Sequence, residues 1–404
     1  MTPADRKRGG RGAGIAAWCL LALIAAARCV GAEDAAPVVL PAQTVPEEPA
    51  RKVGTIEPVF VRPFTAVESG RNDGNPVWSR SGMFLSFERS IGDRKEIRIA
   101  LADGLVFQTV YYLRAAGGDM KFFFPGVVED ISYNAGISWS PREERFVFMS
   151  NGGEGNYDLY VGDMGGKPVT RITEHKEKDG QSDWSPSSNT IVFVSGRTDK
   201  GDIYLMDADT RALTRLTRSG KENLYPQWSP DGKRIVYMHG NNENHDIAVI
   251  NDVSRPAESV KALTAWEHDD IRPVWSPDGK KIAFYSNYNP QGDPRIWSIM
   301  VVAADGSDPA TGDGLAAKAV AIDVVPDVER GPAWMHDSKR LVYVKNDRQE
   351  YHPLYVVNIT ERTPLLLKTD TKMNHDVACS PDGTIAFRAQ VDQWDQIFVA
   401  KMKE

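Results

Sequence analysis

The chain has 404 residues, of which 41% are hydrophobic and 25% charged, and its formal net charge is −7. A protein that binds nucleic-acid phosphates needs clustered Lys and Arg, and an acidic chain without a basic stripe is repelled by them. We therefore expect no nucleic acid among the partners. The length accommodates two ordinary domains or one large all-β domain.

The N-terminus has the pattern of a secretory signal peptide. Basic residues from Arg6 to Arg11 precede an apolar run from Ile15 to Ala27, and small residues follow at Val30 and Ala32. This order predicts a signal peptide over residues 1–32 that is cleaved near Ala32. The apolar run is shorter than the about 20 residues that a transmembrane helix needs. The mature chain is thus expected to be periplasmic or secreted, with no transmembrane segment.

Removal of the signal peptide changes the charge and the cysteine content. Residues 1–32 contain five basic residues and one acidic residue, so the net charge falls from −7 to −11. In a lipoprotein, Cys29 would be the acylated residue. Such sites need a small side chain before the cysteine, whereas Arg28 stands there, so the lipoprotein is the less favoured interpretation. Cys379 is then the last remaining cysteine, so no intramolecular disulfide is expected. Stability must come from packing.

A tryptophan-centred repeat organises the rest of the chain. Its key position is occupied by Trp78, Trp139, Trp184, Trp228, Trp275, Trp334 and Cys379. Most intervals are close to the about 40 to 45 residues of a four-stranded propeller blade, and two are longer. Because the tryptophans share one repeat position, we expect them to fill the contacts between neighbouring blades.

The unit around Trp228 shows how one repeat folds. A short extended segment over 224–228 is followed by the turn Ser229-Pro230-Asp231-Gly232. Pro presets the first corner, Asp bonds local amides and Gly accepts a positive φ. Segments 234–239, 246–251 and 260–264 then have strand composition. The repeat therefore predicts a four-stranded meander.

The two ends of the chain predict how the ring closes. The residues after Cys379 end before a fourth strand, whereas Val53 to Thr65 has strand composition and precedes the first full unit. This segment can complete the last blade, which leaves few exposed sheet edges. An open stack of meanders would leave its terminal repeats uncapped. We predict an all-β, seven-bladed β-propeller of four-stranded blades over 53–404, closed by an N-terminal strand that completes the last blade, after a linker over 33–52.

These residues resemble the TolB-like family of WD-repeat-related propellers. Ser-Pro-Asp-Gly recurs at Ser229, Ser276 and Ser380, and an Asp-apolar third-strand motif begins at Asp158, Asp202 and Asp246. We expect these three aspartates to bond turn amides. The resemblance implies an exported propeller that binds partners. The 33–52 linker leaves no room for the additional α/β domain that TolB carries before its propeller, so the partners of TolB are not transferred.

The sequence contains no common catalytic motif. A Gly-x-Ser-x-Gly elbow, a His-Glu-x-x-His helix and a P-loop are all missing. Prolyl peptidases join a similar propeller to an α/β-hydrolase domain, but the propeller repeats here run to Glu404, so we expect no peptidase activity. Oligogalacturonate lyases, which are seven-bladed propellers, hold a divalent ion with His ligands. The candidates for such a metal are His268 and His375, which lie at different repeat offsets, and, less plausibly, His245, His336 and His352.

Acidic residues precede most of the inner strands and are predicted to ring one mouth of the channel. They are Asp73, Asp179, Glu222, Asp269, Asp270, Glu329 and Asp376. The ring has the chemistry to bind a basic partner segment or a divalent cation such as Ca²⁺. Arg71, Arg272 and Arg330 interrupt it, and solvated turn residues are the alternative interpretation.

Two stretches break the repeat period, Val106 to Asp130 and Ala303 to Val328. Long loops on a rigid scaffold commonly carry recognition. The first contains four aromatic residues that are candidates for a partner surface: Tyr111, Tyr112, Phe122 and Phe123. It is either a projecting hairpin or an outer strand pair packed on its own blade.

Together these observations favour a monomeric binding scaffold for an envelope protein or glycan, without catalytic residues or an obligatory cofactor. The alternative is a metal-dependent propeller enzyme similar to an oligogalacturonate lyase.

Overall fold

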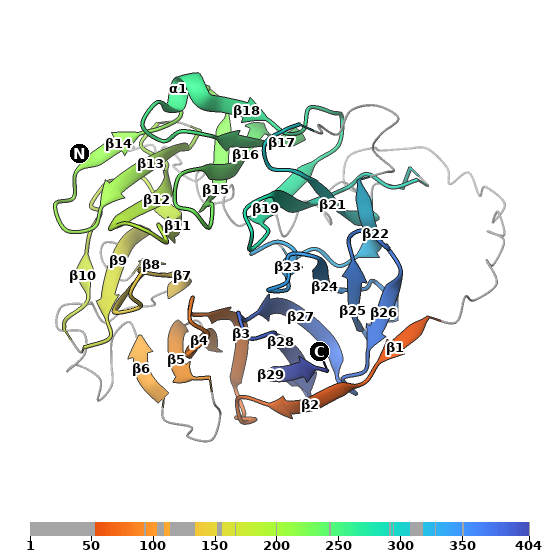
Figure 1. Ribbon diagram of the computed structural model, residues 1–404. Helices are drawn as coiled ribbons and strands as arrows, with labels where there is room; N and C mark the ends of the chain where they lie inside the picture. Colours follow the sequence, from red (N-terminus) through yellow and green to blue (C-terminus); the bar gives the residue numbers. More distant parts are fainter. Residues whose placement is uncertain are drawn as a thin grey trace, which may run out of the picture. The chain divides into compact units, whose positions relative to one another are not determined.

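The computed structural model describes most of the chain from residue 53 onward. The described residues are 53–92, 94–102, 109–113, 134–151, 156–165, 167–198, 200–241, 244–290, 292–293, 295–307, 318–327, 329–349 and 351–403. Lys52–Glu404 form one compact unit of seven β-sheets that follow one another around a ring (Figure 1). No helix in the described ranges is both long and apolar enough to cross a membrane.

The first four blades follow the chain order. Blade 1 contains β3 (Arg71–Trp78), β4 (Phe84–Ile91), β5 (Arg94–Leu101) and β6 (Thr109–Leu113). Blade 2 contains β7 (Asn134–Trp139), β8 (Arg145–Ser150), β9 (Asp158–Asp163) and β10 (Thr170–Arg171). Blade 3 contains β11 (Asp179–Trp184), β12 (Thr190–Ser195), β13 (Asp202–Asp207) and β14 (Leu213–Arg215). Blade 4 contains β15 (Glu222–Trp228), β16 (Ile235–Asn241), β17 (Asn244–Ile250) and β18 (Val260–Ala262), with the short helix α1 (Pro256–Ser259) before β18.

The last three blades include the N-terminal strands. Blade 5 contains β19 (Asp270–Trp275), β20 (Lys281–Ser286), β21 (Trp297–Ala303) and β22 (Ala319–Val324). Blade 6 contains β23 (Ala333–Trp334), β24 (Arg340–Val344), β25 (Leu354–Asn358) and β26 (Pro364–Leu367), with β1 (Gly54–Ile56) as a fifth strand. Blade 7 contains β27 (Lys372–Cys379), β28 (Thr384–Val391) and β29 (Trp394–Met402), with β2 (Pro58–Pro63) as its outer strand.

The predicted closure is confirmed. β2 pairs antiparallel with β29, from Pro58 opposite Met402 to Pro63 opposite Phe398, so the N-terminal segment supplies the strand that blade 7 lacks. The prediction of one continuous strand is wrong, because β1 instead pairs in parallel with β26 of blade 6. The chain passes from blade 6 to blade 7 at Glu57, and Pro58 suits the start of a new strand because it donates no amide hydrogen bond.

Threonines that follow the fourth strands by two residues make the same contact in the closing blade as in ordinary blades. In blades 2, 3 and 4, a threonine hydroxyl accepts a hydrogen bond from the backbone amide of the third strand. Thr65 accepts the corresponding bond from the amide of Ile397 at 3.0 Å in blade 7. The aspartates that begin third strands were expected to bond turn amides. Asp158, Asp202 and Asp246 accept hydrogen bonds from these threonine hydroxyls, and only Asp246 also accepts one from a loop amide, that of Trp266, among the described residues.

Each inner strand contains an irregularity three residues before the repeat position. The residues there have positive φ in all seven blades: Asn75, Gly136, Gln181, Tyr225, Arg272, Gly331 and Asp376. In six blades the strand register also shifts here, as in a β-bulge. All but Asp376 line the central channel, and Asp376 lines a pocket at its mouth.

The repeat tryptophans pack as predicted. Five of them are buried and Trp78 is half-buried. The indole Nε1 of Trp78 donates to the Ala378 carbonyl at 3.2 Å, and that of Trp275 donates to the Gln227 carbonyl at 3.2 Å, each in the preceding blade. The hydrophobic core accordingly lies between blades, as where Val192 of blade 3 packs in one cluster with Trp228 of blade 4.

We predict that Thr65→Val lowers the free energy of unfolding by about 1 to 3 kcal/mol, because it leaves the amide of Ile397 without its acceptor inside the protein. Urea denaturation followed by tryptophan fluorescence measures this. The exposed Thr363→Val is the matched control and should unfold like the parent. Equal stability of the two variants would contradict the role of the N-terminal strand in closing blade 7.

Candidate functional site

The structure places the seven carboxylates that were predicted to ring the channel mouth in three separate groups. Asp73, Glu329 and Asp376 line one pocket. Asp179 and Asp270 are buried inside blades 3 and 5. Glu222 and Asp269 contact the His245 ring at 3.3 and 2.9 Å. Burial lowers the pKa of His245, but the hydrogen bonds and charges of Asp269 and Glu222 outweigh it and raise this pKa to about 9.

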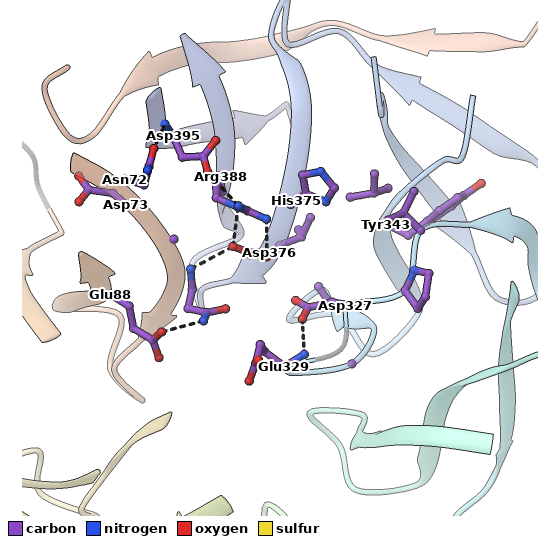
Figure 2. Close-up of a pocket in the computed structure, with 18 of the residues that line it drawn as sticks. Asn72, Asp73, Glu88, Asp327, Glu329, Tyr343, His375, Asp376, Arg388 and Asp395 are labelled. Carbon is purple, nitrogen blue, oxygen red and sulfur yellow. Dashed lines mark hydrogen bonds and ion pairs between the residues drawn. The ribbon is translucent and has the colours of Figure 1, made fainter. Parts of the chain in front are cut away.

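The mouth pocket is a cavity of about 540 Å³ formed mainly by blades 1, 6 and 7. Figure 2 shows Asp73 and Glu88 at the left of the pocket, Asp395 and Arg388 above, and Asp327 and Glu329 at the lower right. The pocket therefore lies where the first blade meets the last blade. Six carboxylates line it, together with Lys95, Arg388 and His375.

Four of the six carboxylates are paired with cations. Arg388 contacts Asp376 at 2.8 Å and Asp395 at 2.9 Å. Lys95 contacts Glu88 at 2.8 Å. Asp73 accepts two hydrogen bonds from Arg89, at 2.6 and 2.7 Å. These ion pairs hold the side chains of the pocket walls in place. They also neutralise much of the negative charge of the four carboxylates.

The other two carboxylates, Asp327 and Glu329, belong to the loop between β22 and β23. Asp327 Oδ1 accepts hydrogen bonds from the amides of Glu329 and Arg330, at 2.9 and 3.1 Å. Its Oδ2 is shielded from solvent and has no hydrogen-bond partner among the described residues. Burial and the nearby charge of Asp376 raise the pKa of Asp327 to about 6. Glu329 is exposed and forms no ion pair within the described ranges.

Sequence reasoning missed Asp327 because it lies seven residues before Trp334, farther from the repeat position than any of the other acidic candidates. A carboxylate two residues before Glu329, ahead of an inner strand, is the one signal that could have drawn attention to it. Its proximity to Asp376 arises only from the fold.

Hydrogen bonds across the junction of blades 7 and 1 hold the pocket together. The amide of Asn75 in β3 donates to Asp376 Oδ2 in β27 at 3.2 Å. The amide of Asp395 in β29 donates to Asn72 Oδ1 in β3 at 2.9 Å. The geometry of the pocket thus depends on closure of the ring.

The two histidines proposed as metal ligands lie apart. His375 lines the mouth pocket, and its Nε2 is 3.0 Å from Nδ1 of His352, with the rings edge to face. Burial and Arg388 lower the pKa of His375 to about 4. His268 instead packs edge-on against Tyr288, with centroids 5.2 Å apart. Among the described residues, no three or more His, Cys, Asp or Glu side chains form a group that could hold a metal ion.

The candidate aromatic partner surface falls largely outside the described residues. Tyr111 and Tyr112 belong to β6, the fourth strand of blade 1, and their side chains are not among those described. Phe122 and Phe123 lie outside the described ranges, so the aromatic surface stays a prediction.

Comparisons with known proteins agree with this architecture. Residues 126–309 match the family described as the TolB beta propeller domain. The crystal structure of TolB from Acinetobacter baumannii is 20% identical, with coverage of 77% of this chain and 66% of that one and a TM-score of 0.49. This chain thus spans slightly less than two thirds of that TolB.

Two other solved structures share the fold more closely. An oligogalacturonate lyase in complex with manganese is 14% identical, with coverage of 85% of this chain and 93% of that one and a TM-score of 0.62. An oligogalacturonate lyase from Vibrio parahaemolyticus is 13% identical, with coverage of 85% and 94% and a TM-score of 0.59. No curated protein matches the chain.

One predicted mouth residue, Asp270, has an unusual environment inside blade 5. Its exposed fraction is 0%, and the side chains of Ser286, Thr264 and Trp266 lie close enough to lower its pKa, although neither carboxylate oxygen has a hydrogen bond of standard geometry among the described residues. The equivalent Asp179 in blade 3 pairs with Arg197 at 2.9 Å, but blade 5 has Tyr288 at the position of that arginine. Burial therefore raises the pKa of Asp270 well above its ordinary value.

We predict that Asp270→Asn makes the protein more stable than the parent at pH 8, by at least about 1 kcal/mol, but not near pH 4. The folded parent holds the Asp270 proton more tightly than the unfolded chain does, so its stability is highest at low pH and falls as the pH rises. Urea denaturation at several pH values measures the difference. The exposed Glu361→Gln serves as the control, and a parallel pH dependence of parent and Asp270→Asn would show that Asp270 is not the cause.

Proposed function

Because this chain is a TolB-like β-propeller, we propose that it is an exported binding scaffold whose mouth pocket receives a cationic group of an envelope protein. Export rests on the signal peptide predicted over residues 1–32. A glycan that carries an amino group offers the same chemistry and is the other class of partner compatible with the pocket.

The observation that supports this proposal most strongly is the pair of carboxylates without cation partners. Asp327 and Glu329 face the mouth pocket while the other four carboxylates are bound to Arg or Lys (Figure 2). Asp327 is half-buried and its Oδ1 is hydrogen-bonded, but a shielded Oδ2 without a partner is costly, and a lysine or arginine head group that reaches it would supply the missing hydrogen bond. The cavity of about 540 Å³ falls within the range of small-ligand sites and accommodates such a side chain.

The remaining groups of the pocket favour binding over catalysis. Arg388 is held by two carboxylates and Lys95 by one, so neither is available to polarise a substrate without breaking its ion pair. Such fixed pairs suit a preorganised recognition surface, in which charge complementarity selects the partner.

We predict that the double substitution Asp327→Asn with Glu329→Gln weakens partner binding at least about tenfold, because it removes both free charges of the mouth pocket. The mature protein is immobilised, and proteins retained from an envelope extract are quantified at low and high salt. Binding by the parent should decrease with salt, since exposed charges are screened.

The exposed Glu361→Gln removes one charge outside the pocket and should behave like the parent. Binding by the parent should also fall as the pH drops through about 6, where Asp327 takes up a proton. Retention of every partner by the double variant at all pH values would contradict the proposal.

A metal-dependent lyase is the second candidate, and one observation favours it. His352 and His375 are in contact at the edge of the mouth pocket, and the fold resembles that of a lyase solved with manganese. This candidate requires a transition metal bound beside His375.

We predict that chelator treatment leaves the thermal midpoint unchanged, because a binding scaffold holds no metal, whereas a bound ion at free concentration L would stabilise the folded state by RT ln(1 + L/Kd) and its removal would lower the midpoint. Differential scanning calorimetry of the mature protein before and after dialysis against EDTA measures this, with metal analysis of both samples. A stoichiometric metal that is lost in His375→Ala, together with a lower midpoint after chelation, would favour the lyase.

A further inference from the structure

The central channel contains a second cavity, of about 530 Å³, beneath the mouth pocket. Three arginines line it, Arg80 of blade 1, Arg272 of blade 5 and Arg330 of blade 6. None of the three forms an ion pair within 4.0 Å in the part of the chain that the structure describes. The channel therefore differs in chemistry from the carboxylate-rich mouth pocket.

Arg272 is the most constrained of these arginines. Its exposed fraction is 5%, and the guanidinium carbon lies 3.1 Å from the centroid of the Tyr225 ring in blade 4. Nη1 donates to the Glu329 carbonyl at 3.3 Å. A guanidinium has five N–H donors, and burial of an arginine without a carboxylate is costly. Stacking on Tyr225 fixes the plane of the group, so its remaining donors are preorganised.

A glycine in the neighbouring blade 6 packs closely against Arg272. Gly331 has φ 103°, and a Cβ atom at this position would lie 2.4 Å from the Arg272 carbonyl oxygen. Glycine therefore lets the chain of blade 6 approach the Arg272 backbone closely. The residue before it, Arg330, donates through Nη2 to the Asn75 carbonyl in blade 1. Arg272 and Arg330 are thus both held by backbone carbonyls and line the same cavity.

The carboxylates of the channel have other partners or lie at its mouth. Glu88 is paired with Lys95, and Asp183 accepts hydrogen bonds from Ser138 Oγ at 2.7 Å and the Trp228 amide at 2.8 Å. Glu329 is exposed at the mouth end. Asp327, in the mouth pocket, interacts electrostatically with Arg330 and Arg272, but it forms no ion pair within 4.0 Å with either of them.

We propose that the channel binds an oxyanion, a carboxylate or a phosphate, between the guanidinium groups of Arg272 and Arg330. The planar fork of arginine matches both groups with parallel hydrogen bonds. This site does not depend on the cation site at the mouth, and a single partner with both charges could occupy the two. The oxyanion has two possible sources, a free ion and the terminal carboxylate of a protein chain.

Titration calorimetry on the mature protein tests the site with three probes at constant ionic strength: inorganic phosphate, acetyl-trialanine and the C-terminal amide of the same peptide. We expect phosphate or the peptide acid to bind and the peptide amide not to bind. Binding of both anions indicates a site for small oxyanions, and binding of the acid alone indicates a site for a chain terminus.

The arginines are tested by Arg330→Gln and Arg272→Lys, each of which should weaken anion binding at least about tenfold. Arg330 is only half-buried, so its variant decides the matter if Arg272→Lys does not fold, as judged by its melting curve. Arg255→Gln, at the exposed residue just before helix α1, is the matched control. The proposal is wrong if no anion binds, if the amide binds as well as the acid, or if Arg330→Gln binds the anions like the parent.

Discussion

The structure depends on the pairing of the N-terminal strand β2 with β29. In a ring of blades, the first and last blades contact each other only when the two ends of the chain meet. Bringing together ends so far apart in the sequence costs conformational entropy, and the contacts at that junction must offset this cost. β2, Phe64 and Thr65 provide that offset through the strand ladder, a buried ring and a buried hydroxyl. The mouth pocket lies at the same junction, so closure and recognition use one set of contacts.

A shared backbone geometry explains how a regular ring acquires an irregular site. The positive φ three residues before the repeat position recurs in every blade, and most of these residues face the channel. The side chains differ, with Arg272 in blade 5, a glycine in blade 6 and Asp376 in blade 7. Repeated residues therefore maintain the scaffold, while the side chains that vary between blades, at this position and next to it, differ in charge along the channel and its mouth.

The sequence was sufficient to predict the ring, its seven blades, its closure and the packing of the tryptophans, because these features follow from spacing and strand composition. It was insufficient for features that depend on cross-strand neighbours. Asp179 and Asp270 have the same repeat offset, yet only Asp179 faces an arginine. The parallel pairing of β1 with blade 6 and the proximity of Asp327 to Asp376 likewise have no signature in the repeat.

The most direct test of the account is amide hydrogen exchange at the junction of blades 7 and 1, followed by mass spectrometry. In the parent, peptides from β3 and β29 should exchange as slowly as those from β11 to β13 in the middle of the ring, because all of them open only with global unfolding. In Thr65→Val, the peptides of β3, β27 and β29 should exchange faster than global unfolding allows. The peptides of blade 3 should still exchange only at the rate set by global unfolding of the variant. Early exchange of blade 7 in the parent, or unchanged exchange at the junction in Thr65→Val, would contradict the claim that the N-terminal strand closes the ring and builds the pocket.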